Sequence, residues 1–202
     1  MAPENSRPEP GQLRLFTAIA LPAELKNAAA GLINNLQKGI QFTGAHPAWV
    51  RPDALHQTLV FLGWLAAERL DAVRDAMTEG AAGTWPFQLG VAQVCLFPNP
   101  KMPKIIAMEL NGGMDELAAL QARHAAACSA RGFEVDTRPF RPHLTLARIK
   151  SMKGLAGLRD VVKIHHNASL GSFLADRITL YRSILSPDGA RYEVVAEQLL
   201  GE

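Results

Sequence analysis

Cysteine is scarce in this sequence, and long apolar runs are missing. The two cysteines, Cys95 and Cys128, lie in apolar contexts and form no Cys-x-x-Cys pair, which favours buried free thiols in a reducing compartment. No segment reaches the ~20 apolar residues that a membrane span needs. The apolar stretch 13–21 is interrupted by Arg14 and does not have the form of a signal peptide. We therefore expect a cytoplasmic protein that does not enter a membrane.

An excess of charge of one sign is missing as well. Lysine and arginine number 21 against 19 aspartate and glutamate residues, a formal net charge of +2. This balance is too mild for strong nonspecific binding to nucleic acid, although it allows a local basic groove.

Motifs for metal ions and nucleoside triphosphates are also absent. The sequence has no His-Glu-x-x-His, no cluster of acidic residues like those of two-metal phosphoesterases, and no phosphate-binding loop ending in Gly-Lys-Ser/Thr. We predict that the protein requires no metal ion and no cofactor.

What is present is enough apolar sequence for one well-packed domain. The chain has 202 residues, of which 48% are hydrophobic. Residues 1–11 contain three prolines and no apolar run, so we predict a disordered lead-in followed by a single domain of two lobes over 12–202.

Hydrophobic periodicity predicts both strands and helices, in an order that is not a strict alternation. The predicted strands are 13–20, 55–62 (ended by Gly63), 87–97, 104–110, 143–149, and a hairpin of 173–183 and 192–199 around the turn signal SPDG. The predicted helices are 24–38 (after Pro22 in the first turn), 66–80, 114–131 and, more weakly, 155–166. This order favours an α+β fold.

The pattern His-x-Thr occurs twice, each time in an apolar strand. The copies are HQTLVFLG, which begins at His56, and HLTLARI, which begins at His143. Because residues i and i+2 of a strand share a face, His56 lies beside Thr58, and His143 beside Thr145. The two copies suggest an internal duplication with a shared cleft.

Two imidazoles and two hydroxyls suit phosphodiester chemistry without a metal. Histidine exchanges protons near neutral pH, so one ring can activate the nucleophile while the other protonates the leaving oxygen. Threonine hydroxyls can donate hydrogen bonds to the phosphate oxygens where charge accumulates. A single histidine on a strand is more often a core or edge residue, but a repeat in matching contexts favours a function. The other histidines (His46, His124, His165 and His166) have no such motif, and we expect them at the surface or on helix faces.

At these residues the chain resembles the 2H phosphoesterase superfamily, named for its paired histidines. Within it, the resemblance is to the RNA 2′,3′-cyclic phosphodiesterases, historically called 2′-5′ RNA ligases (LigT-like). It spans about 13–199 and is carried by RLFTAIALP, HQTLVFLG, PFRPHLTLAR and ITLYRSILSPDGARYEVV. The resemblance implies a bilobal α+β fold in which two antiparallel sheets are related by pseudo-twofold symmetry around a central cleft, with helices outside.

The resemblance also implies roles for residues. His56 would donate a proton to the leaving 3′ oxygen, His143 would accept one from water, and Thr58 and Thr145 would bind phosphate oxygens, yielding a 2′-phosphomonoester. Arg148 matches a phosphate-holding position of the family. An ideal strand turns a residue five positions after His143 to the opposite face, so Arg148 needs a bulge, the strand's end or its own length to reach the cleft. Arg141, Phe16 and Tyr181 are weaker candidates.

Three functional interpretations stay open from the sequence. The first is an enzyme that hydrolyses RNA or nucleoside 2′,3′-cyclic phosphates, and we expect a monomer because nothing in the motifs demands a partner chain. The second is a 2′-5′ RNA ligase or 2′-5′ oligonucleotide phosphodiesterase that uses the same cleft. The third is a noncatalytic module that binds RNA ends.

Overall fold

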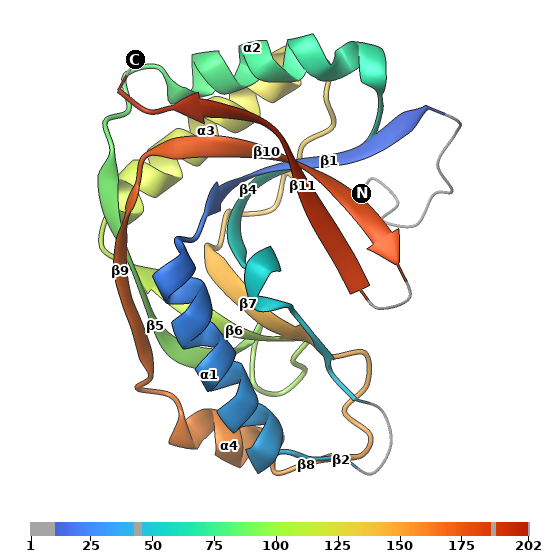
Figure 1. Ribbon diagram of the computed structural model, residues 1–202, viewed down its shortest axis with the longest axis vertical. Coiled ribbons are helices and arrows are strands. Elements are labelled where there is room, and N and C mark those ends of the chain that lie inside the picture. The colour runs from blue at the N-terminus through green and yellow to red at the C-terminus, as the bar shows by residue number, and fades with distance from the viewer. Residues whose placement is uncertain (1–10, 43–45, 187–188, 202) are drawn as a thin grey trace.

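The computed structural model describes residues 11–42, 46–186 and 189–201 and has an α+β fold built on two antiparallel sheets (Figure 1). The four-stranded sheet, in the order β11-β10-β1-β4, consists of β1 (Gln12–Ala20), β4 (His56–Ala66), β10 (Arg177–Ser186) and β11 (Gly189–Leu199). The five-stranded sheet, in the order β3-β7-β6-β5-β9, consists of β3 (Ala48–Trp49), β5 (Phe87–Phe97), β6 (Ile105–Asn111), β7 (His143–Arg148) and β9 (Ser169–Ala175). The predicted fold class is confirmed. The predicted lead-in lies outside the described residues except for Gly11.

A third, two-stranded sheet was not predicted. It pairs β2 (Gln41–Phe42) with β8 (Leu155–Ala156). Strands of two residues are too short to produce a hydrophobic alternation, so the sequence carries no periodic signal for them.

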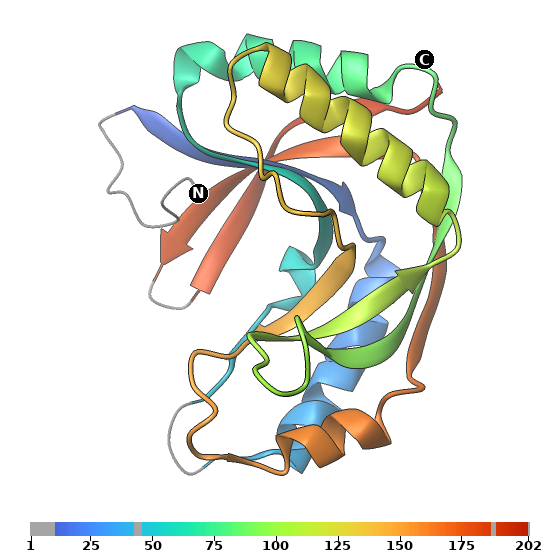
Figure 2. The ribbon, with the colours of Figure 1, turned by 180° about the vertical axis from the view of Figure 1, so that it is seen from behind.

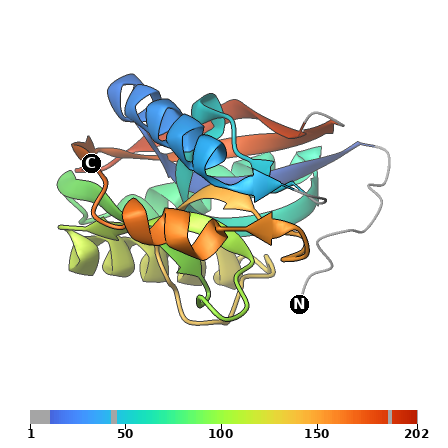
Figure 3. The ribbon, with the colours of Figure 1, turned by 90° about the horizontal axis from the view of Figure 1, so that it is seen from below.

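The helices pack on the outer sides of the two sheets (Figures 1 and 2). They are α1 (Ala23–Gly39), α2 (Leu70–Ala81), α3 (Met114–Ala130) and α4 (Leu158–Ile164), with single 3₁₀ turns at Pro52–Ala54 and Ala67–Arg69. Helices α2 and α3 contact each other and the four-stranded sheet, whereas α1 and α4 lie against the five-stranded sheet. Helices α1 and α3 consequently lie on opposite sides of the strands (Figure 3). Helix α1 begins one residue after Pro22, which holds the N-cap position in extended conformation.

The two halves of the chain repeat one order of elements, the two-residue strands aside. The first half runs β1, α1, β4, α2, β5, and the second runs β6, α3, β7, α4, β10, with β9 as an additional strand before β10. Strand β5, from the first half of the chain, pairs with β6 in the five-stranded sheet. Strand β10, from the second half, pairs with β1 in the four-stranded sheet. This arrangement makes the two motif strands, β4 and β7, equivalent positions of a pseudo-twofold fold.

The predicted strand 173–183 is wrong in one respect, because the structure divides it at Asp176. Strand β9 pairs with β5 in one sheet, and β10 pairs with β1 in the other. The Asp176 carboxylate accepts a hydrogen bond from Arg177 Nε at 2.9 Å, and its carbonyl accepts one from Leu200 N–H at 2.8 Å. Only Asp176 and Arg177 interrupt the apolar residues at the break, and the pairing partners reveal the change of sheet. The predicted hairpin of β10 and β11 is present, although turn residues 187–188 lie outside the described part.

Gly63 does not end the first motif strand. Strand β4 continues to Ala66, and Gly63 has a φ of +74° at a register shift against β1. Glycine adopts this left-handed conformation without the clash that a side chain would cause, and a bulge there bends the strand instead of terminating it.

His124 lies on a face of helix α3, one of the two expected positions, but that face is buried and not at the surface. Its side chain is completely inaccessible, between α3 and the four-stranded sheet. Nε2 lies 2.8 Å from Thr17 Oγ1, and Nδ1 lies 3.1 Å from the Ala76 carbonyl oxygen. Both ring nitrogens therefore have partners, which is what makes burial of the imidazole tolerable.

No helix in the described ranges is both long enough and apolar enough to span a membrane.

Candidate active site

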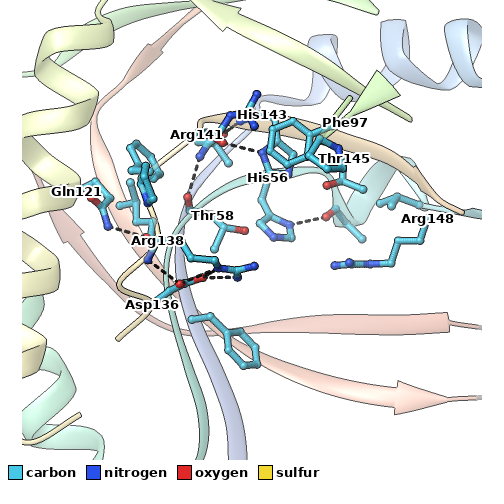
Figure 4. Close-up of a pocket in the computed structure, with 18 of the residues that line it drawn as sticks. His56, Thr58, Phe97, Gln121, Asp136, Arg138, Arg141, His143, Thr145 and Arg148 are labelled. Atoms are coloured by element: carbon cyan, nitrogen blue, oxygen red, sulfur yellow. Dashed lines mark hydrogen bonds and ion pairs between the residues drawn. The ribbon is translucent and has the colours of Figure 1, made fainter. Parts of the chain in front are cut away.

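A cavity of about 590 Å³ lies between the two motif strands and is lined from both. All five sequence-predicted site residues line it, namely His56, Thr58, His143, Thr145 and Arg148 (Figure 4). The structure thus brings together two segments that are far apart in the chain. The same walls include Phe61, Phe97, Gln57 and Tyr192, which the sequence did not single out.

Both motif strands carry a bulge three residues after the histidine. In β4 the register against β1 skips Leu59, and in β7 the register against β6 skips Leu146. Each bulge leaves two consecutive buried residues and reverses the alternation beyond them. An ideal strand would turn Arg148 away from His143, but because of the bulge Arg148 faces the cavity. Phe61 occupies the equivalent place on β4.

The two imidazoles are held in the same way. Nδ1 of His56 lies 2.7 Å from the Ala54 carbonyl oxygen, and Nδ1 of His143 lies 2.8 Å from the Arg141 carbonyl oxygen. Because a carbonyl can only accept, Nδ1 carries the proton in both rings. The neutral ring then has its lone pair on Nε2, the nitrogen that is left to exchange a proton with a ligand.

Burial makes both histidines poor cations in the unliganded protein. The pKa of His56 is lowered to about 4, mainly because burial penalises the charged ring, with the charges of Arg148, Lys26 and His143 acting in the same direction. The hydrogen bond to Ala54 opposes this shift. The pKa of His143 is also lowered, first by burial and then by the charges of Arg148 and Arg141. The cationic side chains that contribute to both shifts would attract an anionic ligand.

Positive charge and hydroxyl donors are available to such an anion. The guanidinium of Arg148 forms no hydrogen bond or ion pair with the described residues, and it enters the cavity on the side opposite Gln121 and Arg138 (Figure 4). The hydroxyls of Thr58 and Thr145 likewise have no protein partner within the described ranges. These groups keep their hydrogen-bonding capacity for a ligand.

Aromatic rings pack against both imidazoles. Phe97 stacks on His143 with ring centroids 4.5 Å apart, and the Arg141 guanidinium also lies 4.5 Å from the centroid of Phe97. His56 contacts Phe16 at 4.7 Å and meets Tyr192 edge-on at 5.1 Å. Phe16 is only 3% exposed and belongs to the core. Phe97 and Tyr192 come from strands β5 and β11, and no local motif marks them.

Metal ligands do not gather in the described part of the chain. No group of three or more His, Cys, Asp or Glu side chains there could hold a metal ion. Cys95 and Cys128 are both free thiols.

Comparisons with known proteins identify relatives of this chain. Curated relatives named RNA 2′,3′-cyclic phosphodiesterase include one from Methanothermobacter thermautotrophicus, 25% identical over 90% of this chain and 95% of its own length. Another, from Methanocaldococcus jannaschii, is 28% identical over 92% of this chain and 99% of its own.

Solved structures show the same fold. TT0787 of Thermus thermophilus has a TM-score of 0.73 and 25% identity, and the match covers 93% of this chain and 98% of that one. LigT of E. coli, solved with 3′-AMP, has a TM-score of 0.71 and 23% identity over 95% and 99% of the two chains. The family model described as LigT-like phosphoesterase matches residues 20–107 and 110–192. These matches span both motif strands and most of the sequence, and the chain belongs to the LigT-like phosphoesterase family.

Proposed function

We propose that this protein is an RNA 2′,3′-cyclic phosphodiesterase that opens cyclic phosphate ends of RNA, or nucleoside 2′,3′-cyclic phosphates, to 2′-phosphomonoesters. The observation that carries the proposal is that equivalent strands present two imidazoles to one cavity, each with Nδ1 held by a backbone carbonyl. Relatives with this enzyme name cover nearly the whole chain.

In the proposed reaction, one histidine accepts a proton while the other donates one. His143 Nε2 accepts a proton from water as the water oxygen bonds to phosphorus. The bond from phosphorus to the 3′ oxygen breaks, and His56 Nε2–H transfers its proton to that oxygen. The product carries a 2′-phosphate and a 3′-hydroxyl, and exchange with solvent restores the starting protonation of both rings. Each well-placed acid or base contributes about 10²–10⁴-fold.

Thr58, Thr145 and Arg148 hold the phosphate in this proposal. The two hydroxyls donate hydrogen bonds to the non-bridging oxygens, and the guanidinium balances the charge that grows on them in the transition state. Arg148 also orients the phosphate, because its planar donor fork matches two oxygens at once.

The bound anion resolves an apparent conflict in the role of His56. A donor must be protonated, yet burial lowers the pKa of His56 to about 4 in the unliganded protein. A phosphodiester carries a negative charge, which raises the pKa of a neighbouring imidazole. The donor therefore becomes protonated together with substrate binding, while His143 acts from its neutral form.

The test uses adenosine 2′,3′-cyclic phosphate with the wild type and with His56→Ala and His143→Ala. Each substitution is expected to reduce kcat by about 10²–10⁴-fold while circular dichroism and Tm stay near wild type. His165→Ala is the matched control, because Nδ1 of His165 is also held by a carbonyl, that of Val161 at 3.0 Å, but this histidine lies outside the cavity. Activity close to wild type in either motif variant would contradict the proposal.

Product analysis distinguishes the alternative activities. We expect a 2′-phosphomonoester from a cyclic end, and activity that persists in EDTA because the acid, the base and the phosphate ligands are all side chains. A new 2′-5′ linkage between two RNA ends would instead show a ligase, and tight binding without turnover would show a noncatalytic RNA-end module.

We further propose that the enzyme acts as a monomer in the cytoplasm. Every residue of the proposed machinery comes from one chain, and the free thiols of Cys95 and Cys128 suit a reducing compartment. Its partner would be RNA that ends in a cyclic phosphate.

A further inference from the structure

Gln57 breaks the symmetry between the two motifs. It stands between His56 and Thr58, and it is only 2% exposed. The equivalent residue of the second motif is Leu144, which is completely buried and apolar. A carboxamide without partners is costly to bury, so a polar side chain in this position calls for specific hydrogen bonds.

The Gln57 carboxamide joins the backbones of the two motifs. Its Oε1 accepts a hydrogen bond from the His143 backbone N–H at 2.9 Å. Its Nε2 donates one to the Thr58 carbonyl oxygen at 2.7 Å. One partner is thus the threonine of the first motif and the other is the histidine of the second.

The sheet topology explains why this link matters. Strand β4 is the edge strand of the four-stranded sheet, whereas β7 belongs to the five-stranded sheet. The two motif strands are therefore not neighbours in one hydrogen-bonded ladder. The carboxamide lies between them and bonds to each as a peptide group of an intervening strand would.

We propose that Gln57 is a positioning residue that sets the separation of the two imidazoles across the scissile phosphate. This inference rests on the proposed phosphodiesterase function, since it concerns the geometry of the same reaction. His143 must reach the attacking water while His56 reaches the leaving oxygen on the other side of phosphorus. A shift of about 1 Å in such an arrangement reduces the rate by about 10²-fold.

Gln57→Met is the first test, because methionine keeps the length of the side chain and removes both hydrogen bonds. We expect kcat for adenosine 2′,3′-cyclic phosphate to fall by about 10²-fold, while KM stays close to wild type because the phosphate ligands remain. The matched control is Ile33→Val, a mild loss of buried volume in α1, where Ile33 is 5% exposed. The control is expected to lower Tm slightly and leave kcat unchanged.

A readout independent of activity accompanies this variant. In the wild type the His143 amide is bonded to Gln57, so its hydrogen exchange should be slow by NMR. We expect faster exchange of that amide in Gln57→Met and unchanged exchange in Ile33→Val.

Gln57→Glu is the second test and remains informative if the methionine variant does not fold. An ionised carboxylate still accepts from the His143 N–H but cannot donate to the Thr58 carbonyl. A protonated carboxyl does both, as the carboxamide does, and burial raises the pKa of such a group. We expect the ratio of its kcat to that of the wild type to increase as the pH is lowered, whereas the ratio for Gln57→Met stays flat.

The outcomes separate this inference from the proposed function. If the wild type hydrolyses the substrate but Gln57→Met retains a wild-type kcat, the positioning role is refuted and the phosphodiesterase proposal stands. A rise in KM alone, or a ratio for Gln57→Glu that does not respond to pH, would also refute it. If the wild type shows no hydrolysis, the proposed function fails, and the exchange of the His143 amide still decides whether Gln57 holds the second motif.

Discussion

Binding of an anion in the cavity should change the protonation of His56 more than that of any histidine outside it. In the unliganded protein the pKa of His56 is about 4, and burial is the main cause. A unit negative charge about 4 Å from the ring, at an effective dielectric constant of about 20, favours the imidazolium by about 4 kcal/mol. This free energy corresponds to a pKa higher by about 3. We therefore predict that the pKa of His56 rises to near 7 in the complex.

The assay is a pH titration of the ring nitrogens by long-range ¹H–¹⁵N NMR, with and without ligand. A suitable ligand is 2′-deoxyadenosine 3′-methylphosphate, a phosphodiester whose charge does not change across the titration and which has no 2′-hydroxyl to react. The spectrum of His56→Asn assigns the His56 signals.

His124 provides the internal control. Its pKa is also lowered by burial, but it lies in the core between α3 and the four-stranded sheet, away from the lining of the cavity. Its titration should not change when the ligand binds. A His56 pKa near 6.5 in the free protein, or one that the ligand leaves in place, would refute the electrostatic reasoning and the donor role built on it.

The phosphate ligands and the buried His124 give three more expected outcomes. Arg148→Met should raise KM by about 10- to 100-fold in steady-state assays, because it removes a charge-assisted hydrogen bond to the phosphate. Arg182→Met, a change outside the cavity, is the control and should leave KM unchanged. A KM of Arg148→Met equal to that of the wild type would contradict the phosphate-holding role. Thr58→Val and Thr145→Val should each reduce kcat for the same substrate about 10-fold or more. A kcat equal to that of the wild type would show that the hydroxyls do not contact the transition state. The free energy of unfolding in urea should decrease as the pH falls below about 6.5, because the unfolded chain then binds protons that the buried His124, His56 and His143 do not. His124→Gln should make this dependence shallower, and an unchanged slope would exclude His124 as a contributor.

Apolar segments bounded by turn residues made much of the fold predictable. Strand β5 coincides with the predicted 87–97, and α3 begins at the predicted residue, Met114. Strand β5 is rich in apolar residues and is followed by Pro98, and α3 lies between Gly113 and Gly132, so turn residues mark their ends. The break at Asp176 was missed because the sequence on either side is strand-like and does not reveal which sheet each part joins.

The site was predictable only where its residues follow one another along a strand. His56 and Thr58 share a face by simple alternation, as do His143 and Thr145. Arg148 required the bulge, whose sequence signal is the pair of apolar residues three and four positions after each histidine, Leu59–Val60 in β4 and Leu146–Ala147 in β7.

Residues brought in by tertiary contacts had no such signal. Phe97 packs on His143 from β5, Tyr192 meets His56 from β11, and Gln57 bonds to a strand of the other sheet. These partners depend on how the two halves of the chain are assembled, which no local pattern encodes.

Strands β9 and β10 are separated by Asp176 alone, yet they belong to different sheets. Hinge motions need a few residues that can absorb large changes of backbone angle, and a nearly continuous β ribbon offers almost none. The separation of the two sheets on either side of the cavity should therefore change little. We therefore expect a ligand to enter through movements of side chains at the mouth of the cavity more than through rotation of one sheet against the other.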